Sequence, residues 1–135
     1  FAAKLAYPDR RVILLIGDGA VGFNIMEFDT AVRHNLAILA ILGNDSAWGI
    51  DRNIQLGLYN RTVASDLWPT RYDQVVRGLG GHGEHVEHPD ELPEAIERAL
   101  KLEQPALLNV DIQRAISPRA EASIARWKSK GGIPF

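Results

Sequence analysis

The chain has 135 residues, of which 46% are hydrophobic and 24% are charged, and its formal net charge is −2. These values are typical of one globular domain and exclude a disordered or fibrous chain. The small net charge argues against a nucleic-acid partner, and the absence of cysteine excludes disulfides, zinc thiolates and a cysteine nucleophile. Since no apolar run approaches the ~20 residues that cross a bilayer, we expect no membrane partner and a cytoplasmic location.

Short apolar runs alternate with longer stretches of helical periodicity along the chain. Strands are predicted at residues 12–16, 37–42, 84–86 and 106–111, and helices at residues 23–34, 70–79 and 90–102. The first, second and fourth strands are almost entirely apolar, which is typical of strands covered on both faces. This alternation predicts the α/β class, with a parallel sheet and helices on both faces.

The two ends of the chain differ from this pattern. Residues 1–7 resemble the last turns of a helix, so we expect a C-terminal fragment whose domain is incomplete at its N-terminus. An Arg/Lys-rich helix that packs as an arm is predicted after Ser117-Pro118, ending at Gly131-Gly132. We therefore expect a domain over residues 1–115 and a C-terminal tail over residues 116–135.

Two internal segments carry more specific expectations. Residues 45–65 lack clean periodicity and are long enough for a functional loop beside a site. The helix predicted at 23–34 places several apolar side chains near one stripe, namely Phe23, Met26, Ala31 and Val32. Trp68 and Trp127 are predicted to be packing residues.

A glycine-flanked loop, Gly17-Asp18-Gly19, follows the first predicted strand and opens a helix. Backbone N–H groups at the start of a helix favour an anion such as a phosphate. Together with Gly22 the loop matches the G-x-G-x-x-G fingerprint, and Asp45 follows the next strand, where an acid that binds ribose would lie. A dinucleotide-binding domain of an oxidoreductase or regulatory protein is therefore an open alternative.

The charge of Asp18 favours a different ligand. Two like charges about 4 Å apart repel by on the order of 4 kcal/mol at an effective dielectric constant near 20, so a carboxylate beside a phosphate needs a cation between them. Mg²⁺ is commonly held by one or two carboxylates together with phosphate oxygens. Asp45 supplies the second carboxylate, because parallel strands end at the same edge of a sheet. The spacing thus indicates a metal–diphosphate site.

Gly17-Asp18-Gly19 is followed, after 24 residues, by Asn44-Asp45. This pattern resembles the signature of thiamine-diphosphate-dependent enzymes, in which Gly-Asp-Gly precedes a paired Asn at a similar distance. The likeness extends over almost the whole chain and identifies it as similar to the C-terminal, diphosphate-binding domain of acetolactate synthase-like, benzaldehyde lyase-like and 2-hydroxyacyl-CoA lyase-like proteins. Asp45 departs from the pattern, since most relatives carry Asn there.

The resemblance implies thiamine diphosphate and Mg²⁺ as cofactors and assigns residues to them. The implied cofactor-binding residues are Gly17, Asp18, Gly19, Ala20, Asn44, Ala47 and Trp48. Mg²⁺ would be held by the carboxylates of Asp18 and Asp45 and the backbone carbonyl of Ala47. Gly19 and Ala20 would offer N–H groups to the diphosphate, while Asn44 would fix the loop. Ile50 and Asp51 fall where relatives line the reaction pocket.

The implied enzyme makes or breaks a C–C bond next to a carbonyl, by 2-keto acid decarboxylation and carboligation or by 2-hydroxyacyl-CoA cleavage. Its activating Glu is expected outside this chain, in a pyrimidine-binding domain of the same or a partner chain. A homodimer or homotetramer is expected for the complete enzyme, whereas this chain alone should be inactive. A catalytically inactive relative that serves as a scaffold is a further alternative.

Three histidines, His82, His85 and His88, are interleaved with Glu84 and Glu87. Because successive side chains of a strand point to opposite faces, the three imidazoles are not expected to converge on one ion. We expect a surface edge here.

Overall fold

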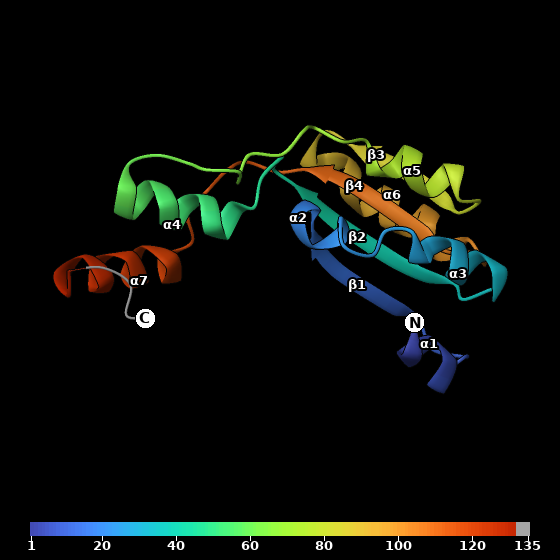
Figure 1. The fold of residues 1–135 in the computed structure, drawn as a ribbon. Coiled ribbons are helices and arrows are strands. Elements are labelled where there is room, and N and C mark those ends of the chain that lie inside the picture. Colours follow the sequence, from blue (N-terminus) through green and yellow to red (C-terminus); the bar gives the residue numbers. More distant parts are fainter. Residues whose placement is uncertain (132–135) are drawn as a thin grey trace.

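Residues 1–131, which the computed structural model describes, fold into a four-stranded parallel sheet flanked by helices (Figure 1). The strands are β1 (Val12–Gly17), β2 (Ile38–Asn44), β3 (His82–Val86) and β4 (Ala106–Asp111). The helices are α1 (Ala2–Ala6), α2 (Asp18–Val21), α3 (Glu27–Arg33), α4 (Gly49–Tyr59), α5 (Tyr72–Gly78), α6 (Leu92–Lys101) and α7 (Pro118–Ser129), with a 3-10 turn η1 (Pro89–Glu91). The parallel order β1-β2-β4-β3 confirms the predicted strands and the α/β class.

The hydrophobic core lies on both faces of the two central strands, β2 and β4. On one face Leu42 and Leu107 are fully buried with Phe28 of α3 and Val76 of α5. On the opposite face Leu108 is buried against the alanine-rich side of α6. Neighbouring residues of β4 thus enter different halves of the core, as the alternation of a strand requires. The predicted helical cover on both faces of the sheet is confirmed.

Strand β1 has the apolar sequence of a covered strand but lies at the edge of the sheet. It pairs only with β2 among the described strands, and Leu15 is 75% exposed, with Ile13 and Leu14 also exposed. A groove of about 660 Å³ runs along it toward α2 and α3. The expectation that this strand is covered on both faces is therefore wrong for the chain by itself, because burial depends on neighbours that its own sequence does not specify.

The predicted helix at 23–34 is shorter than expected and turns a different face to the core. The chain passes through a series of turns after α2, in which Phe23 N–H donates to the carbonyl of Ala20, and helical structure resumes at α3. These turns shift the phase of the helix, so that Phe28 and Ala31 are buried. Phe23 and Met26 are 74% and 63% exposed whereas Ala31 is buried, so the prediction that they share one stripe is wrong.

Segment 45–65, expected to be a loop, contains helix α4. This helix lies beside α7, away from the sheet (Figure 1). The contact is close at Gly57, where an added Cβ would come within 2.7 Å of Ile124. Ile124 is buried at 6% exposure, so the glycine that obscured the helical pattern is also the residue that lets the two helices meet.

The predicted tail helix is present as α7. Pro118 occupies its first position, and the side chain of Ser117 accepts a hydrogen bond from the N–H of Ala120 at 3.2 Å. The helix ends at Ser129, before the expected Gly131-Gly132, and Gly132 lies outside the described residues. Neither α7 nor any other described helix has the length and apolarity that crossing a membrane requires.

The two tryptophans that were expected to pack differ in their surroundings. Trp127 lies on α7 and is partly buried. Trp68 is 81% exposed in the segment that leads from α4 to α5, so its predicted packing role is wrong for the chain by itself.

Candidate cofactor and metal site

The carboxyl ends of β1 and β2 lie side by side and open into one cavity. Their register pairs Gly17 with Gly43, so the chain leaves both strands at the same edge of the sheet. Helix α2 follows β1 directly, and a turn over residues 45–48 follows β2. Between them lies a cavity of about 420 Å³. Its lining combines both segments with the start of α4: Gly17, Asp18, Gly19, Ala20, Gly43, Asp45, Ala47, Trp48, Gly49, Ile50, Asp51 and Ile112.

Asp18 is a buried carboxylate at the centre of this arrangement. It is 3% exposed, and its Oδ2 accepts a hydrogen bond from the N–H of Ala47 at 3.0 Å. Burial raises the pKa of its carboxyl above the ordinary value, and the charge of Asp45 adds to the rise, although N–H groups of Gly19 and Ala47 oppose it. A cation in the cavity would relieve both the lost hydration and the repulsion between the two acids.

The carboxylate of Asp45 lies close to the backbone of Gly49, the first residue of α4. An added Cβ at Gly49 would come within 2.8 Å of Asp45 Oδ2, a distance that would force the carboxylate to move. Only a glycine at this position leaves the carboxylate where it lies. The glycine at the start of α4 therefore leaves room for the second acid in the cavity.

The turn that carries Asp45 and Ala47 is held by several hydrogen bonds. Ser46 has φ of 53°, in the left-handed region that is unfavourable for residues other than glycine. Its N–H donates to Asn44 Oδ1 at 3.1 Å, and its carbonyl accepts from the N–H of Leu67 at 2.8 Å. These contacts hold a turn that would otherwise relax, and so they fix the direction of the Ala47 backbone beside Asp18.

Arg114, which the sequence analysis did not single out, secures the same turn from outside. Its Nε donates to the carbonyl of Asp45 at 2.7 Å and its Nη2 to the carbonyl of Ser46 at 2.6 Å. Its Nη1 also donates to Asp66 at 2.9 Å, and Arg52 donates to the same carboxylate at 2.8 Å. A lone arginine after a strand has no local signal for this role, because its partners are distant in the sequence.

Trp48 covers one side of the cavity. Its ring lies against Gly19, where an added Cβ would stand 2.8 Å from the indole. Phe23 packs edge-on against the same ring, with the two centroids 5.3 Å apart. Phe23 thus lies beside the aromatic wall of the cavity and not in the core of the sheet.

The structure thus brings most of the predicted site residues together. Those expected to bind cofactor or metal, and the two expected to line the reaction pocket, all line the cavity, with the exception of Asn44. Asn44 lies behind the turn, where it is 7% exposed and borders a separate cavity of about 300 Å³ with Arg71 and His85. Its hydrogen bond to Ser46 agrees with the expected role of fixing the loop.

The donor set fits a hard divalent cation. Two carboxylates and a backbone carbonyl are oxygen ligands, which Mg²⁺ prefers, and they leave coordination positions for phosphate oxygens. Among residues 1–131 no group of three or more His, Cys, Asp or Glu side chains is arranged to hold a metal ion. Metal binding in this cavity would therefore depend on oxygens from the backbone and from the diphosphate itself.

The histidines of β3 have separate acidic partners. His85 contacts Asp111 at 2.9 Å through Nε2 and Glu87 at 3.2 Å through Nδ1, whereas His82 faces Glu84 at 3.5 Å. They lie on a strand at the opposite edge of the sheet from β1 and take no part in the 420 Å³ cavity.

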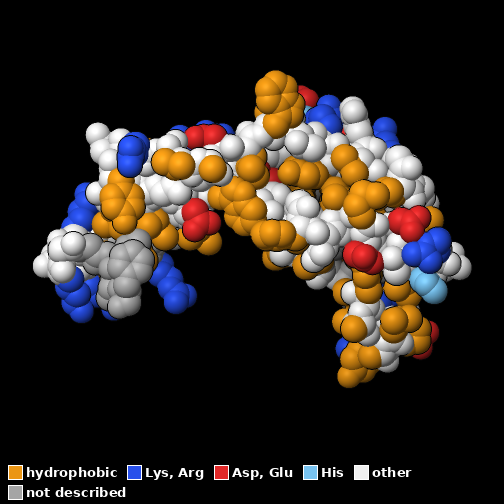
Figure 2. Space-filling model, viewed as in Figure 1, with side chains coloured by type: hydrophobic (Ala, Val, Ile, Leu, Met, Phe, Trp, Pro, Cys, Tyr) orange, Lys and Arg blue, Asp and Glu red, His pale blue; other side chains and the backbone are white. Residues whose placement is uncertain are grey.

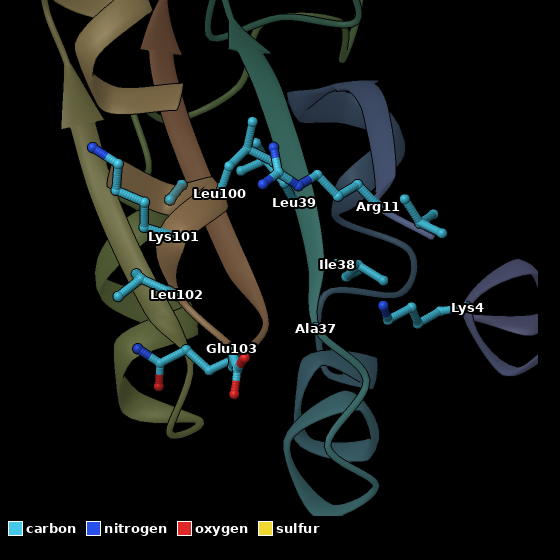
Figure 3. A pocket seen from close by; sticks show the side chains of 12 residues that line it. Lys4, Arg11, Ala37, Ile38, Leu39, Leu100, Lys101, Leu102 and Glu103 are labelled. Atoms are coloured by element: carbon cyan, nitrogen blue, oxygen red, sulfur yellow. The ribbon is translucent and has the colours of Figure 1, made fainter. Parts of the chain in front are cut away.

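Another cavity, of about 370 Å³, lies at the amino ends of the strands, where Lys4 and Arg11 face α6 and the segment after it (Figure 3). The ammonium of Lys4 already donates to the carbonyls of Pro8 and Arg10 at 2.6 and 2.9 Å. Because ligands of open parallel sheets bind at the carboxyl ends of the strands, the cavity between β1 and β2 is the stronger candidate site.

Comparison with known proteins agrees with this geometry. Residues 1–110 match the family model of the thiamine pyrophosphate enzyme C-terminal TPP binding domain, where TPP is thiamine diphosphate. The chain belongs to this family, and its cofactor is thiamine diphosphate with Mg²⁺ as the usual metal. The recognised resemblance is confirmed, and the family supports this function over the dinucleotide-binding alternative.

The relatives include several kinds of thiamine-dependent enzyme. The chain is 54% identical over 110 residues to a probable acetolactate synthase of Mycobacterium bovis, covering 81% of this chain and 20% of the relative. It is 40% identical over 114 residues to 2-hydroxyacyl-CoA lyase 2 of Caenorhabditis elegans, covering 80% of this chain and 18% of the relative. The chain therefore spans about a fifth of the length of these curated relatives.

A solved structure shares the fold. The thiamine diphosphate-dependent 4-hydroxybenzoylformate decarboxylase of Rhodococcus jostii RHA1 matches with a TM-score of 0.79 and 28% identity, over 85% of this chain and 22% of that chain. The likeness covers the described sheet and agrees with the parallel architecture derived above.

Proposed function

We propose that this domain holds the diphosphate and the metal of thiamine diphosphate within a larger enzyme that makes or breaks a C–C bond next to a carbonyl. The observation that carries the proposal is the pair of acids, Asp18 and Asp45, which line one cavity at the ends of adjacent strands. The names of the relatives favour two substrate classes, 2-keto acids in the acetolactate synthase type and 2-hydroxyacyl-CoA thioesters in the lyase type.

The proposed roles of the individual residues follow from their places around the cavity. Asp18 and Asp45 supply carboxylate ligands to Mg²⁺, and Ala47 supplies its backbone carbonyl. The N–H groups at Gly19 and Ala20, which follow Gly17, bind diphosphate oxygens. Trp48 shields this end of the cofactor from water, and Asn44 fixes the turn, while Ile50 and Asp51 border the substrate. When bound, the cofactor supplies a thiazolium carbanion and an electron sink for the reaction.

The partner of this domain is proposed to be a pyrimidine-binding domain of the same or another chain, which supplies the activating Glu. Hydrophobic side chains gather over β1 and α2, above the hollow between the α4–α7 pair and α1 (Figure 2). Leu15, Met26 and Ile50 are among the exposed apolar residues of the chain, with 75%, 63% and 74% of their surface exposed. Exposed apolar area of this kind favours association, in a homodimer or homotetramer. The cytoplasmic location and the boundary between residues 115 and 116 stay predictions.

The experiment is Asp18→Ala in the assembled enzyme, with Asp9→Ala as the matched control in an exposed turn. The proposal predicts that the Asp18 variant loses thiamine diphosphate on desalting in Mg²⁺ buffer, whereas the Asp9 variant retains it. Retention by the Asp18 variant at the wild-type level would overturn the proposal. Tight binding of NADH without metal would instead favour a dinucleotide site.

A further inference from the structure

A row of polar side chains runs through the interior from α5 to the turn of residues 45–48. Arg71 donates to both oxygens of Asp73 at 2.9 and 2.8 Å, and Asn109 Nδ2 donates to Asp73 Oδ1 at 3.4 Å. Asn44 Nδ2 donates to Asn109 Oδ1 at 3.1 Å, and Asn44 Oδ1 accepts from the N–H of Ser46 at 3.1 Å. We call Arg71, Asp73, Asn109 and Asn44 the polar row.

The polar row lies where apolar side chains would be expected. Asp73 and Asn109 are each 1% exposed, and Asn109 sits on central strand β4 opposite Leu42 of β2. A buried amide without hydrogen bonds is costly, whereas an apolar residue of similar size would have no such requirement. Core packing alone therefore does not account for an amide at this position, while the contacts to Asp73 and Asn44 do.

The direction of the hydrogen bonds in the polar row follows from two acceptors, the carboxylate of Asp73 and the carbonyl of Thr70. Burial raises the pKa of Asp73, but the hydrogen bonds and charge of Arg71 outweigh this and hold the pKa below its ordinary value. An ionised carboxylate only accepts hydrogen bonds, so Asn109 must turn its NH₂ toward Asp73 and its oxygen toward Asn44. Asn44 Nδ2 then donates to Asn109 and also to the carbonyl of Thr70 at 3.1 Å, so the oxygen of Asn44 is left for the N–H of Ser46.

This direction is the one that the turn needs. Ser46 is held in the left-handed region, and a backbone N–H at that point requires an acceptor. If the amide of Asn44 were reversed, its NH₂ would face the N–H of Ser46 and the turn would lose that bond. The next residue, Ala47, is the one whose N–H reaches Asp18 at 3.0 Å.

We propose that Asp73 and Asn109 are positioning residues of the cofactor site, which act through Asn44 to hold the turn carrying Asp45 and Ala47. Neither residue lines the 420 Å³ cavity, so the effect on metal and diphosphate is indirect. The inference deepens the proposed function and rests on it for the identity of the ligands. The order of the turn itself, in the absence of any ligand, does not depend on that identity.

The test exchanges the side-chain types of Asp73 and Asn109 in the assembled enzyme. Asp73→Asn replaces an acceptor by a group that also donates, and Asn109→Asp places a second carboxylate beside Asp73. In the double variant the new amide at position 73 can donate to the new carboxylate at position 109, which can still accept from Asn44. The double variant therefore has no pair of adjacent carboxylates and keeps an acceptor for Asn44 in its place. Asp29→Asn, in the exposed ion pair with Arg33, is the matched control.

Two measurements report on the turn: the exchange rate of the Ser46 amide hydrogen without cofactor, and the Mg²⁺ concentration at half-saturation with thiamine diphosphate present. Each single variant is expected to exchange faster and to need about fivefold to tenfold more Mg²⁺, the effect of one lost hydrogen bond of about 1 kcal/mol or slightly more. The double variant is expected to return to within about threefold of the wild type, and Asp29→Asn is expected to match the wild type.

Three results would overturn the inference. In the first, the single variants lose folding stability but keep the wild-type exchange rate of the Ser46 amide and the wild-type Mg²⁺ dependence. Asp73 and Asn109 would then have a purely structural role. In the second, the double variant is worse than either single variant. In the third, the double variant fails to fold. Because the exchange of Ser46 is measured without cofactor, it tests the polar row even if Asp18→Ala shows that the proposed function is wrong.

Discussion

The indole of Trp48 lies against Gly19, with so little space between them that a Cβ on Gly19 would stand 2.8 Å from Cδ2 and Cε3 of the ring. The contact joins the loop after β1 to the turn after β2, the two segments that meet at the cavity. It also makes the size of residue 19 a determinant of where the aromatic wall lies.

Gly19→Ala is therefore expected to displace Trp48 and to destabilise the fold by about 1–3 kcal/mol, a typical cost of overpacking. Cofactor affinity should fall with it. Gly78→Ala is the matched control, since open space surrounds that position in α5 and alanine favours a helix. Chemical denaturation of the two variants measures the difference. Equal stability of the Gly19 variant and the wild type would show that the ring adjusts freely.

Arg114 is expected to hold the turn of residues 45–48, which is proposed to bind the metal, through the shape of its guanidinium group. Arg114→Lys keeps the charge but cannot reproduce three donors in one plane, so it should behave much like Arg114→Ala. Both variants should need more Mg²⁺ for half-saturation, by about 1 kcal/mol of binding free energy, since the side chain is partly exposed. Arg33→Ala, which breaks an exposed ion pair, is the control and should leave the titration unchanged. Full recovery by lysine would contradict a role of geometry.

The ion pair of Arg71 with Asp73 predicts a pH dependence of stability. The folded-state pKa of Asp73 lies below the ordinary value of 3.8, so its contribution is complete above pH 3.8 and is lost as the pH falls through the folded-state pKa. In Arg71→Gln burial is no longer offset, the folded-state pKa rises, and the ionised carboxylate becomes destabilising. The gap in unfolding free energy between wild type and variant should grow from pH 3 to pH 7, reaching about 1–3 kcal/mol. A gap independent of pH would exclude this origin.

The close contact of Gly57 with Ile124 predicts that α7 depends on the absence of a side chain on α4. Gly57→Val places carbon atoms where Ile124 now lies and should separate the helices. Limited trypsin digestion should then cut faster after Arg119 and Arg126 of α7 than in the wild type. Gly78→Val, in α5, has no neighbour in that position and serves as the control. Unchanged digestion of the Gly57 variant would mean that α7 is held by other contacts.

The parts of the fold that could be predicted were those encoded by local pattern. Strand β4 was located at its observed bounds because its apolar run is uninterrupted and Pro105 precedes it. The shared cavity of Asp18 and Asp45 followed from topology, since adjacent parallel strands end at one edge. Both predictions needed only strand order and the chemistry of the acids.

The parts that could not be predicted depend on contacts between distant segments. Helix α4 was missed because Gly57 interrupts its pattern. The glycine is needed there because Ile124 of α7 lies too close for a side chain. Phe23 was placed on one helical stripe with Ala31 and Val32, because the sequence does not show the turns that direct it to Trp48. The hold of Arg114 on the turn and the row from Asp73 to Asn44 likewise arise only when the sheet has brought those residues together.

The most direct measurement of the central claim is a crystal structure of the assembled enzyme with thiamine diphosphate and Mn²⁺ in place of Mg²⁺, with diffraction data collected at the manganese absorption edge. If Asp18 and Asp45 hold the metal, one anomalous peak is expected in the cavity between β1 and β2, about 2 Å from a carboxylate oxygen of Asp18, from one of Asp45 and from the carbonyl of Ala47. A peak at the histidines of β3, or a diphosphate bound without contact to Asp18, would contradict the central claim.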